Sequence, residues 1–123
     1  MLARTLLVLA IAAVLLAGCG SQNALEQQSK SLKALAAEGG LVAGNAARGR
    51  STTVFTREHT GFLLKSARSS ASALARQTSA KGKRLAQVAA RVRDDLERLQ
   101  RSGSDRAEQQ RVQIDLERIA RQP

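Results

Sequence analysis

Proline is absent from this chain until its last residue, Pro123. Internal proline breaks a helix because it lacks the backbone N–H donor and clashes with the preceding turn. Here nothing imposes such a limit, and good helix formers, chiefly Ala, Leu, Arg, Gln and Glu, fill the sequence. No segment alternates apolar and polar residues with period two, as a half-buried strand would. The sequence therefore predicts an all-α protein.

Apolar residues recur every three or four positions in four segments, which predicts four amphipathic helices. The first helix is expected from Ala24 to Ala47 and the second from Thr53 to Gln77, with a turn at residues 79–82 before the third. The predicted apolar seams contain Leu25, Gln28, Leu32, Leu35, Gly39, Val42 and Ala46, then Phe55, Phe62, Leu63, Ala67 and Leu74, then Leu85, Val88, Val92, Leu96 and Leu99, and finally Val112, Leu116 and Ile119. Short connections between such helices predict a small antiparallel bundle over residues 24–121.

The connections carry capping residues. Gly49 precedes the hydroxyl residues Ser51 and Thr52, and the segment 102–105 ends in Asp105, so both connections combine a helix-ending Gly with an N-cap. Gly39-Gly40 costs about 1 kcal/mol per residue against Ala inside a helix, which makes a break there the competing interpretation. We expect one continuous helix, because a small residue on the seam lets another helix approach closely.

The first 18 residues differ from the rest. One basic residue, Arg4, precedes an unbroken apolar run at residues 6–17. At about 1.5 Å per helical residue this run spans about 18 Å, less than the ~30 Å hydrocarbon core of a membrane. A basic start, a short apolar run and a small-residue end are typical of a secretory signal peptide.

The end of that run, Leu16-Ala17-Gly18-Cys19, resembles the lipobox of bacterial lipoproteins. The resemblance implies cleavage between Gly18 and Cys19 by signal peptidase II, with a diacylglyceryl group, and commonly palmitate, on the mature N-terminal Cys19. Residues 1–18 are then a signal peptide, and residues 19–23 are the lipidated Cys with a short polar linker. Because one acyl chain binds membranes only marginally and a diacylglyceryl group supplies two, the mature chain is expected to be anchored to a membrane without spanning it.

The residue after Cys19 is Gly20. In lipoproteins of diderm bacteria an Asp at this place tends to retain the protein in the inner membrane. By that resemblance a diderm host would place this protein in the outer membrane, and a monoderm host would keep it on the outer face of its cell membrane.

No residues form a recognisable catalytic or metal-binding pattern. The single Cys excludes an intramolecular disulfide, and one Cys with one His excludes a Cys/His zinc site. No Ser lies in a nucleophile motif, and there is no phosphate-binding loop. Three acidic residues of the third and fourth helices lie four positions before arginines, which is the spacing of solvated ion pairs. These pairs are Asp94 with Arg98, Glu97 with Arg101 and Glu117 with Arg121, and Glu26 with Lys30 repeats the pattern. We expect no enzyme, no cofactor and no metal.

His59 is the only histidine, and it lies on the same helical face as Phe55 and Phe62. A metal ligand, a general base or a pH switch would be functional interpretations. Its neighbour Glu58 projects about 100° away on a helix, so the two do not form a ligand pair. We therefore expect a partly buried His59 bonded to a hydroxyl or an amide, with Thr56, Ser66 and Asn45 as the candidates.

The charge is unevenly distributed. The whole chain has a net charge of +10; residues 19–47 sum to zero, residues 48–93 to +10 and residues 94–123 to −1. A solvated polar face is the usual meaning of such a run. The alternative is an anion-facing surface, for which the candidates on the second helix are Arg57, Lys65, Arg68 and Arg76. Anionic lipid head groups or envelope polyanions would suit it, whereas export and two aromatic residues do not favour nucleic acid.

These observations lead to two hypotheses. The first is a lipid-anchored helical protein of the cell envelope that acts by non-covalent interaction as a structural or accessory module. The alternative is a carrier or binding protein for a small apolar ligand held between the helices near Phe55, Phe62 and Leu63, or a surface protein that binds anions through residues 48–93.

Overall fold

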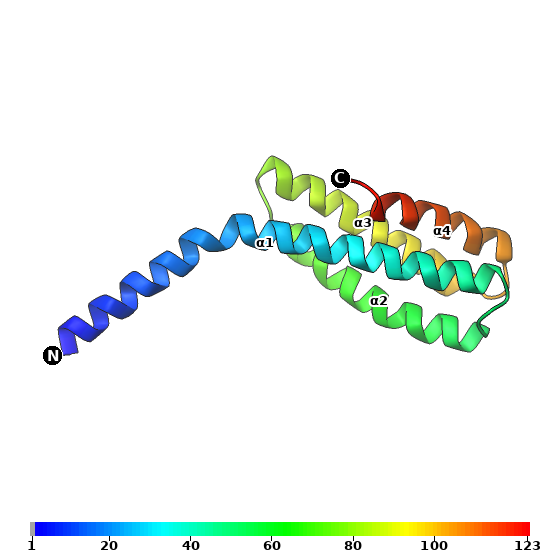
Figure 1. Cartoon of the computed structure of the whole chain (residues 1–123), viewed down its shortest axis with the longest axis horizontal. Coiled ribbons are helices and arrows are strands. Elements are labelled where there is room, and N and C mark those ends of the chain that lie inside the picture. Colours follow the sequence, from blue (N-terminus) through cyan, green and yellow to red (C-terminus); the bar gives the residue numbers. More distant parts are fainter. Residues whose placement is uncertain (1) are drawn as a thin grey trace.

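The computed structural model describes the backbone from Leu2 to Pro123 and the side chains from Asn23 onward. Four α-helices and no strand form within this part of the chain, and they pack as a small all-α bundle (Figure 1). The prediction of the fold class is confirmed. The lipobox side chains, Cys19 included, lie outside the described side chains.

Helix α1 covers Leu2–Ala47 and is much longer than the others. It was expected to begin near Ala24, whereas the backbone is helical from Leu2, so the segment expected as a linker at residues 19–23 is helical as well. The helix also continues through Gly39-Gly40, which confirms the continuous interpretation. Figure 1 shows the N-terminal part of α1 projecting beyond the bundle.

Helix α2 covers Thr53–Leu74. Thr52 is its N-cap, as predicted, and its hydroxyl oxygen accepts a hydrogen bond from the backbone N–H of Phe55 at 3.1 Å. The turn before it uses Gly49 at φ +69°, a conformation that favours glycine. The helix ends three residues earlier than the predicted Gln77, because Ser79 caps the next helix and the chain needs the residues between them to reverse direction.

Helices α3 (Ala80–Arg101) and α4 (Arg106–Ala120) complete the bundle. Ser79 caps α3 by accepting from the N–H of Gly82 at 3.0 Å, so Gly82 lies in the first turn of α3 and not in a connection. Asp105 caps α4 as predicted, with its carboxylate accepting from the N–H of Glu108 at 3.1 Å.

The four helices form a ring in the order α1, α4, α3, α2. Helix α1 packs most extensively on α4, and α2 packs most extensively on α3. Helix α1 also touches α3 across the centre, whereas the described residues of α2 and α4 do not contact each other. Helices α2 and α4 therefore occupy opposite positions in the ring.

The core follows the predicted seams in α1, α3 and α4. Its largest cluster gathers buried residues from all four helices, among them Val42, Leu64, Leu96 and Leu116. A second cluster joins Leu32 and Leu74 with Ala89 near the other end of the bundle. The seam of α2 differs from the prediction, and that difference shapes the candidate site.

Candidate interaction surfaces of the bundle

The candidate anchor, Cys19, is one of the residues of α1. Leu25, the first partly buried residue of the bundle, follows it by six positions, which is about 9 Å along a helix. A lipid on Cys19 would thus be joined to the bundle by a short helical segment.

The four basic candidates are all exposed: Arg57, Lys65 and Arg68 lie on α2, whereas Arg76, expected on the same helix, lies in the turn after its last residue, Leu74. Arg68 reaches Glu97 of α3, with 3.4 Å between Nη2 and Oε1, although most of its side chain remains exposed. The structure therefore places three of the four on α2 and the fourth in the turn that follows, without gathering them at one point.

The two phenylalanines of the chain are on the surface, contrary to the prediction. Phe62 is 78% exposed and Phe55 is 56% exposed, whereas Leu63, Ala67 and Leu74 are buried as expected. Each phenylalanine comes one position before a buried residue and so points about 100° away from it. The buried stripe of α2 instead begins with Thr56 and Thr60.

These two threonines enter the core because their hydroxyl groups are satisfied. The Thr60 hydroxyl donates to the backbone carbonyl of Thr56 at 2.6 Å, and the Thr56 hydroxyl lies 2.9 Å from that of Ser51. The spacing of residues 56, 60, 63, 67 and 74 marks the stripe in the sequence. The prediction included Leu63, Ala67 and Leu74 but missed the two threonines, because it considered apolar residues alone.

His59 of α2 contacts α1 through Glu38. Its Nε2 lies 3.0 Å from Oε1 of Glu38, and both side chains are partly exposed. The Phe55 ring stands edge-on to the imidazole, with 5.6 Å between centroids and 86° between planes. The prediction of a hydroxyl or amide partner is therefore wrong: the partner of the imidazole is the carboxylate of Glu38, which lies 21 positions earlier in the sequence.

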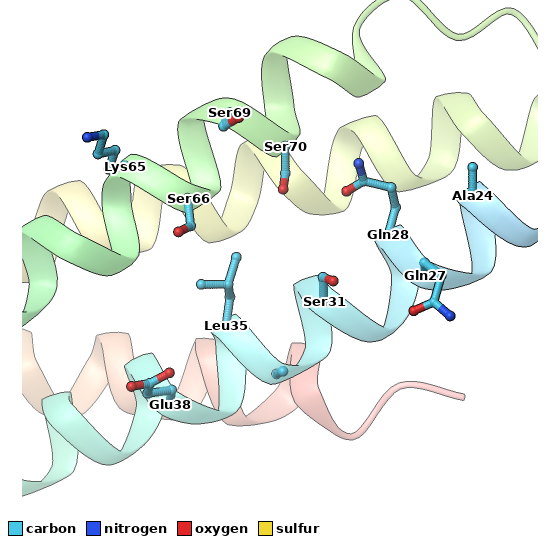
Figure 2. A pocket seen from close by; sticks show the side chains of 11 residues that line it. Ala24, Gln27, Gln28, Ser31, Leu35, Glu38, Lys65, Ser66, Ser69 and Ser70 are labelled. Carbon is cyan, nitrogen blue, oxygen red and sulfur yellow. The ribbon is translucent and has the colours of Figure 1, made fainter.

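An open groove runs between α1 and α2. Its larger part has a volume of about 870 Å³ and is lined mainly by hydroxyl and amide side chains, with Glu38 and Lys65 at one end (Figure 2). The hydroxyl and amide residues that line it are Gln27, Gln28, Ser31, Ser66, Ser69 and Ser70. Beyond Glu38 the groove meets a hollow of about 330 Å³ against Phe55, His59 and Phe62. The hydroxyl and amide groups of this groove can both donate and accept hydrogen bonds.

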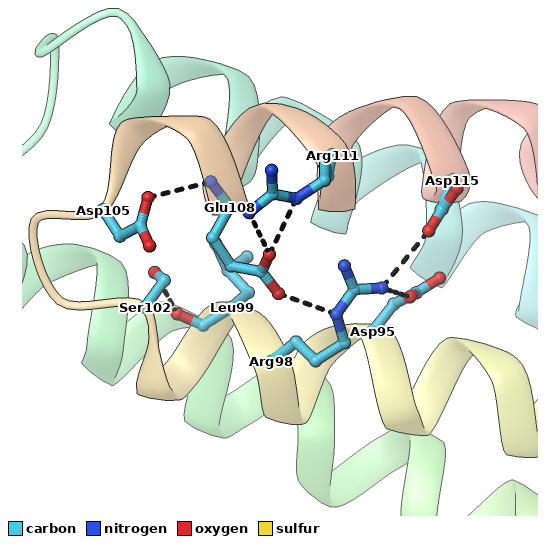
Figure 3. A network of polar contacts seen from close by, with 8 residues as sticks. All are labelled: Asp95, Arg98, Leu99, Ser102, Asp105, Glu108, Arg111 and Asp115. Carbon is cyan, nitrogen blue, oxygen red and sulfur yellow. Dashed lines mark hydrogen bonds and ion pairs between the residues drawn. The ribbon is translucent and has the colours of Figure 1, made fainter.

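Three acidic residues, Asp95 of α3 with Glu108 and Asp115 of α4, form a network around Arg98 (Figure 3). Nε of Arg98 donates to Glu108 at 2.8 Å, and Nη1 donates to Asp95 at 3.0 Å and to Asp115 at 3.3 Å. Arg111 donates to the second oxygen of Glu108 at 3.0 Å. The network joins α3 to α4 along one side of the bundle.

The environment of this network shifts three pKa values. Burial, and then the charge of Asp115, raises the pKa of Asp95 to about 6, although Arg98 acts in the opposite direction. Hydrogen bonds from Arg98 and Arg111 lower the pKa of Glu108. The hydrogen bond to Glu108 raises the pKa of Arg98, which stays charged.

The predicted ion pairs are mostly replaced by others. Asp94 pairs with Arg93 at 3.1 Å, Glu97 pairs with Arg68, and Arg98 belongs to the network above. Only the pair of Glu117 and Arg121 forms as predicted, at 4.0 Å. No ion pair joins Glu26 and Lys30 among the described side chains. Glu97 and Arg98 have other partners because α3 is flanked by α2 and α4, whose charged side chains compete for them.

The bundle offers neither a metal site nor a membrane span among its described residues. Within residues 23–123, no group of His, Cys, Asp and Glu side chains could hold a metal ion. None of the helical segments in that part of the chain is long and apolar enough to cross a membrane.

Comparison with known proteins gives no family. No protein-family model, no curated protein and no solved structure matches the chain.

Proposed function

We propose that this chain is a lipid-anchored protein of the bacterial cell envelope, in which the helical bundle acts by non-covalent interaction as a structural or accessory module. The lipobox at Leu16-Ala17-Gly18-Cys19 is the observation that carries the proposal. It implies cleavage before Cys19, a diacylglyceryl group on the thiol, and an exported position on a cell membrane or outer membrane.

The course of α1 supports this proposal. The same helix that contains the backbone of Cys19 supplies buried residues to the bundle from Leu32 onward. An anchor joined to the bundle through a continuous helix limits how far and in which directions the bundle can move from the membrane. Such a short connection suits a module that works at the membrane surface.

The described surface supports interaction as the mode of action. The features that stand out are an exposed basic helix, a groove lined by hydroxyl and amide groups, and two exposed phenylalanines. Exposed apolar groups of this size are typical of surfaces that contact another molecule.

A carrier for a small apolar ligand is the second candidate. The hollow against Phe55, Phe62 and Leu63 has a volume of about 330 Å³, which is at the lower end of ligand sites. However, both phenylalanines are more than half exposed, so a ligand there would stay largely in contact with water. This candidate is the less well supported of the two.

The anchor is tested by changing Cys19→Ser and following labelled fatty acid and the mass of the intact protein. The unchanged chain is expected to incorporate the label and to begin at Cys19 with a diacylglyceryl group. The variant is expected to accumulate as an uncut precursor without label. Ser21→Ala, two positions away and outside the lipobox, is the matched control and should behave like the unchanged chain. Label in the Cys19→Ser variant, or a membrane form that keeps residues 1–18, would contradict the proposal.

A further inference from the structure

The side of α2 that faces away from the core presents apolar side chains to solvent. Val54, Phe55 and Phe62 are 54%, 56% and 78% exposed, and they occupy little more than two turns of the helix. Leu41 of α1, 65% exposed, lines a hollow together with Phe55 and His59 and so extends the same apolar area. Four of the five large apolar side chains exposed among residues 23–123 are therefore on the side of the bundle formed by α1 and α2.

Basic residues flank these apolar side chains. Lys65 follows Phe62 by three positions and lies on the same face of the helix, whereas Arg57 and Arg68 lie nearer to α3, where Arg57 lines a hollow with Gln100 and Arg68 reaches Glu97. Glu58 is the one acidic residue on α2, and Glu38 of α1 lies at the edge beside His59. We call Val54, Phe55, Glu58, Phe62 and Lys65 the outer face of α2; Arg57 and Arg68 border it on the side nearer to α3. A helix face with aromatic side chains between arginines and lysines is typical of helices that lie in the interface of an anionic membrane.

We propose that the outer face of α2 docks on anionic phospholipid in the membrane that holds the lipid anchor, so that the bundle lies along the bilayer. The inference rests on the proposed lipid anchor at Cys19. The phenylalanines would enter the interface between head groups and acyl chains, and the basic side chains would pair with phosphate groups.

Distance determines which orientation brings this face to the lipid. Glu38, which contacts His59, follows Cys19 by 19 positions on α1, or about 28 Å along the helix. A bundle standing upright on its anchor would hold the outer face of α2 about this far from the lipid, well beyond the ~8–10 Å range of screened charge in physiological salt. A bundle lying on its side brings the same residues to the surface.

Charge also argues for lipid and against a second copy of this chain. Helix α2 carries Arg57, Lys65 and Arg68 against Glu58, a net charge of +2, and it lies within the region from Arg48 to Arg93, whose net charge is +10. Two copies meeting through α2 would place like charges opposite each other, whereas an anionic membrane complements them. Association with a second copy is therefore a competing outcome of the test.

The test uses the full lipidated protein, in which acylation of Cys19 leaves no other native thiol. Ser69→Cys places one fluorescent label on the exposed side of α2, seven positions after Phe62, and Gln110→Cys places the same label at an exposed position of α4 as the matched control. Both proteins are reconstituted in vesicles of phosphatidylcholine alone or with phosphatidylglycerol, and lipids carrying a nitroxide quench any label that touches the bilayer.

We expect stronger quenching at position 69 than at position 110 in the vesicles with phosphatidylglycerol, and loss of that difference in pure phosphatidylcholine. Changing Phe55 and Phe62 together to Ser, or Arg57 and Lys65 together to Gln, should also abolish the difference. Equal quenching at both positions in anionic vesicles would overturn the proposal. Disulfide-linked dimers of the unlabelled Ser69→Cys protein, with no quenching of the labelled one by lipid, would also overturn it, since they would identify a second copy as the occupant. Failure of the anchor itself is recognised separately, because the protein would then lack the lipid mass and wash off the vesicles.

Discussion

Helix α1 meets its two neighbours in the ring in different ways. Against α4 it presents Gly39, Gly40 and Gly44, and large side chains of α4 fill the space above them. Against α2 it presents Ser31 and Ala34 opposite Ser66 and Ser69, and the groove between the helices stays open. Both contacts use small residues, but a large side chain over a small one closes an interface, whereas a small residue opposite another small one leaves a gap. The contact of α1 with α4 thus stabilises the bundle, and the side formed by α1 and α2 remains available for contact with another molecule.

The largest expected effect is a difference in the free energy of unfolding between variants at two residues of α2, Phe62 and Leu64. Leu64→Ala should lower the free energy of unfolding by about 3 kcal/mol, because Leu64 is only 2% exposed and its removal leaves a cavity. Phe62→Ala should change it by less than about 0.5 kcal/mol, because Phe62 is 78% exposed. Urea unfolding followed by circular dichroism measures both. A similar loss for the two variants would mean that Phe62 packs against the protein and that the outer face of α2 is not free.

The second prediction compares the same substitution at two glycines, Gly39 of α1 and Gly61 of α2. A Cβ on Gly39 would lie 2.9 Å from Cδ1 of Leu116 and 3.0 Å from Cδ2 of Leu96, whereas a Cβ on Gly61 would meet only Nε2 of Gln100, at 3.4 Å. Gly39→Leu should therefore cost about 2 kcal/mol, with the strain of overpacking partly offset by the better helix propensity of Leu. Gly61→Leu gains the propensity without the strain and should not destabilise the protein.

Thermal unfolding measures this second comparison. At about 4–8 °C per kcal/mol for a domain of this size, Gly39→Leu should lower the midpoint by roughly 10 °C. An unchanged midpoint for Gly39→Leu would show that α1 and α4 are not in close contact at this glycine.

The smallest effect concerns the polar network that joins α3 to α4. Asp95 has a pKa of about 6, raised from 3.8 mainly by burial, so the folded state disfavours its ionised form. This penalty is complete above pH 6 and disappears as the pH falls toward 4. Asp95→Asn keeps an oxygen that accepts from Arg98 and removes the charge. The variant should be more stable than the unchanged protein by about 1 kcal/mol at pH 7.5, with no difference near pH 4.

Comparing the free energy of unfolding of the unchanged protein and of Asp95→Asn at each pH isolates the contribution of Asp95. Glu108 has a lowered pKa and loses its stabilising contribution as the pH falls below its usual 4.5, but it does so in both proteins. If Asp95→Asn is the less stable protein at pH 7.5, the ion pair with Arg98 outweighs the cost of burying the carboxylate.

The sequence was sufficient to predict features that depend on local chemistry. The caps at Thr52 and Asp105 follow from side chains that satisfy the first N–H groups of a helix, and both were found where expected. The buried seams of α1, α3 and α4 follow from apolar residues at helical spacing. The continuity of α1 through Gly39-Gly40 follows from the benefit of close approach by another helix.

Features that depend on contacts between helices were not predicted. The carboxylate of Glu38 replaced the expected neutral partner of His59, because α1 and α2 lie side by side only after folding. Arg98, expected to pair with Asp94 in solvent, instead joins the buried Asp95 to Asp115 of α4. The exposure of Phe62 depends on two threonines entering the core in its place, and hydrophobicity alone does not indicate this.

The central claim is that the side of the bundle formed by α1 and α2 contacts the membrane, whereas α4 does not. Hydrogen–deuterium exchange on the lipidated protein tests this claim most directly. Exchange is compared in detergent and in vesicles containing phosphatidylglycerol. We expect the vesicles to slow exchange in peptides covering residues 53–65 of α2 and to leave peptides of α4 unchanged. Slower exchange in α4, or the same change across both helices, would contradict the proposed difference between the two sides.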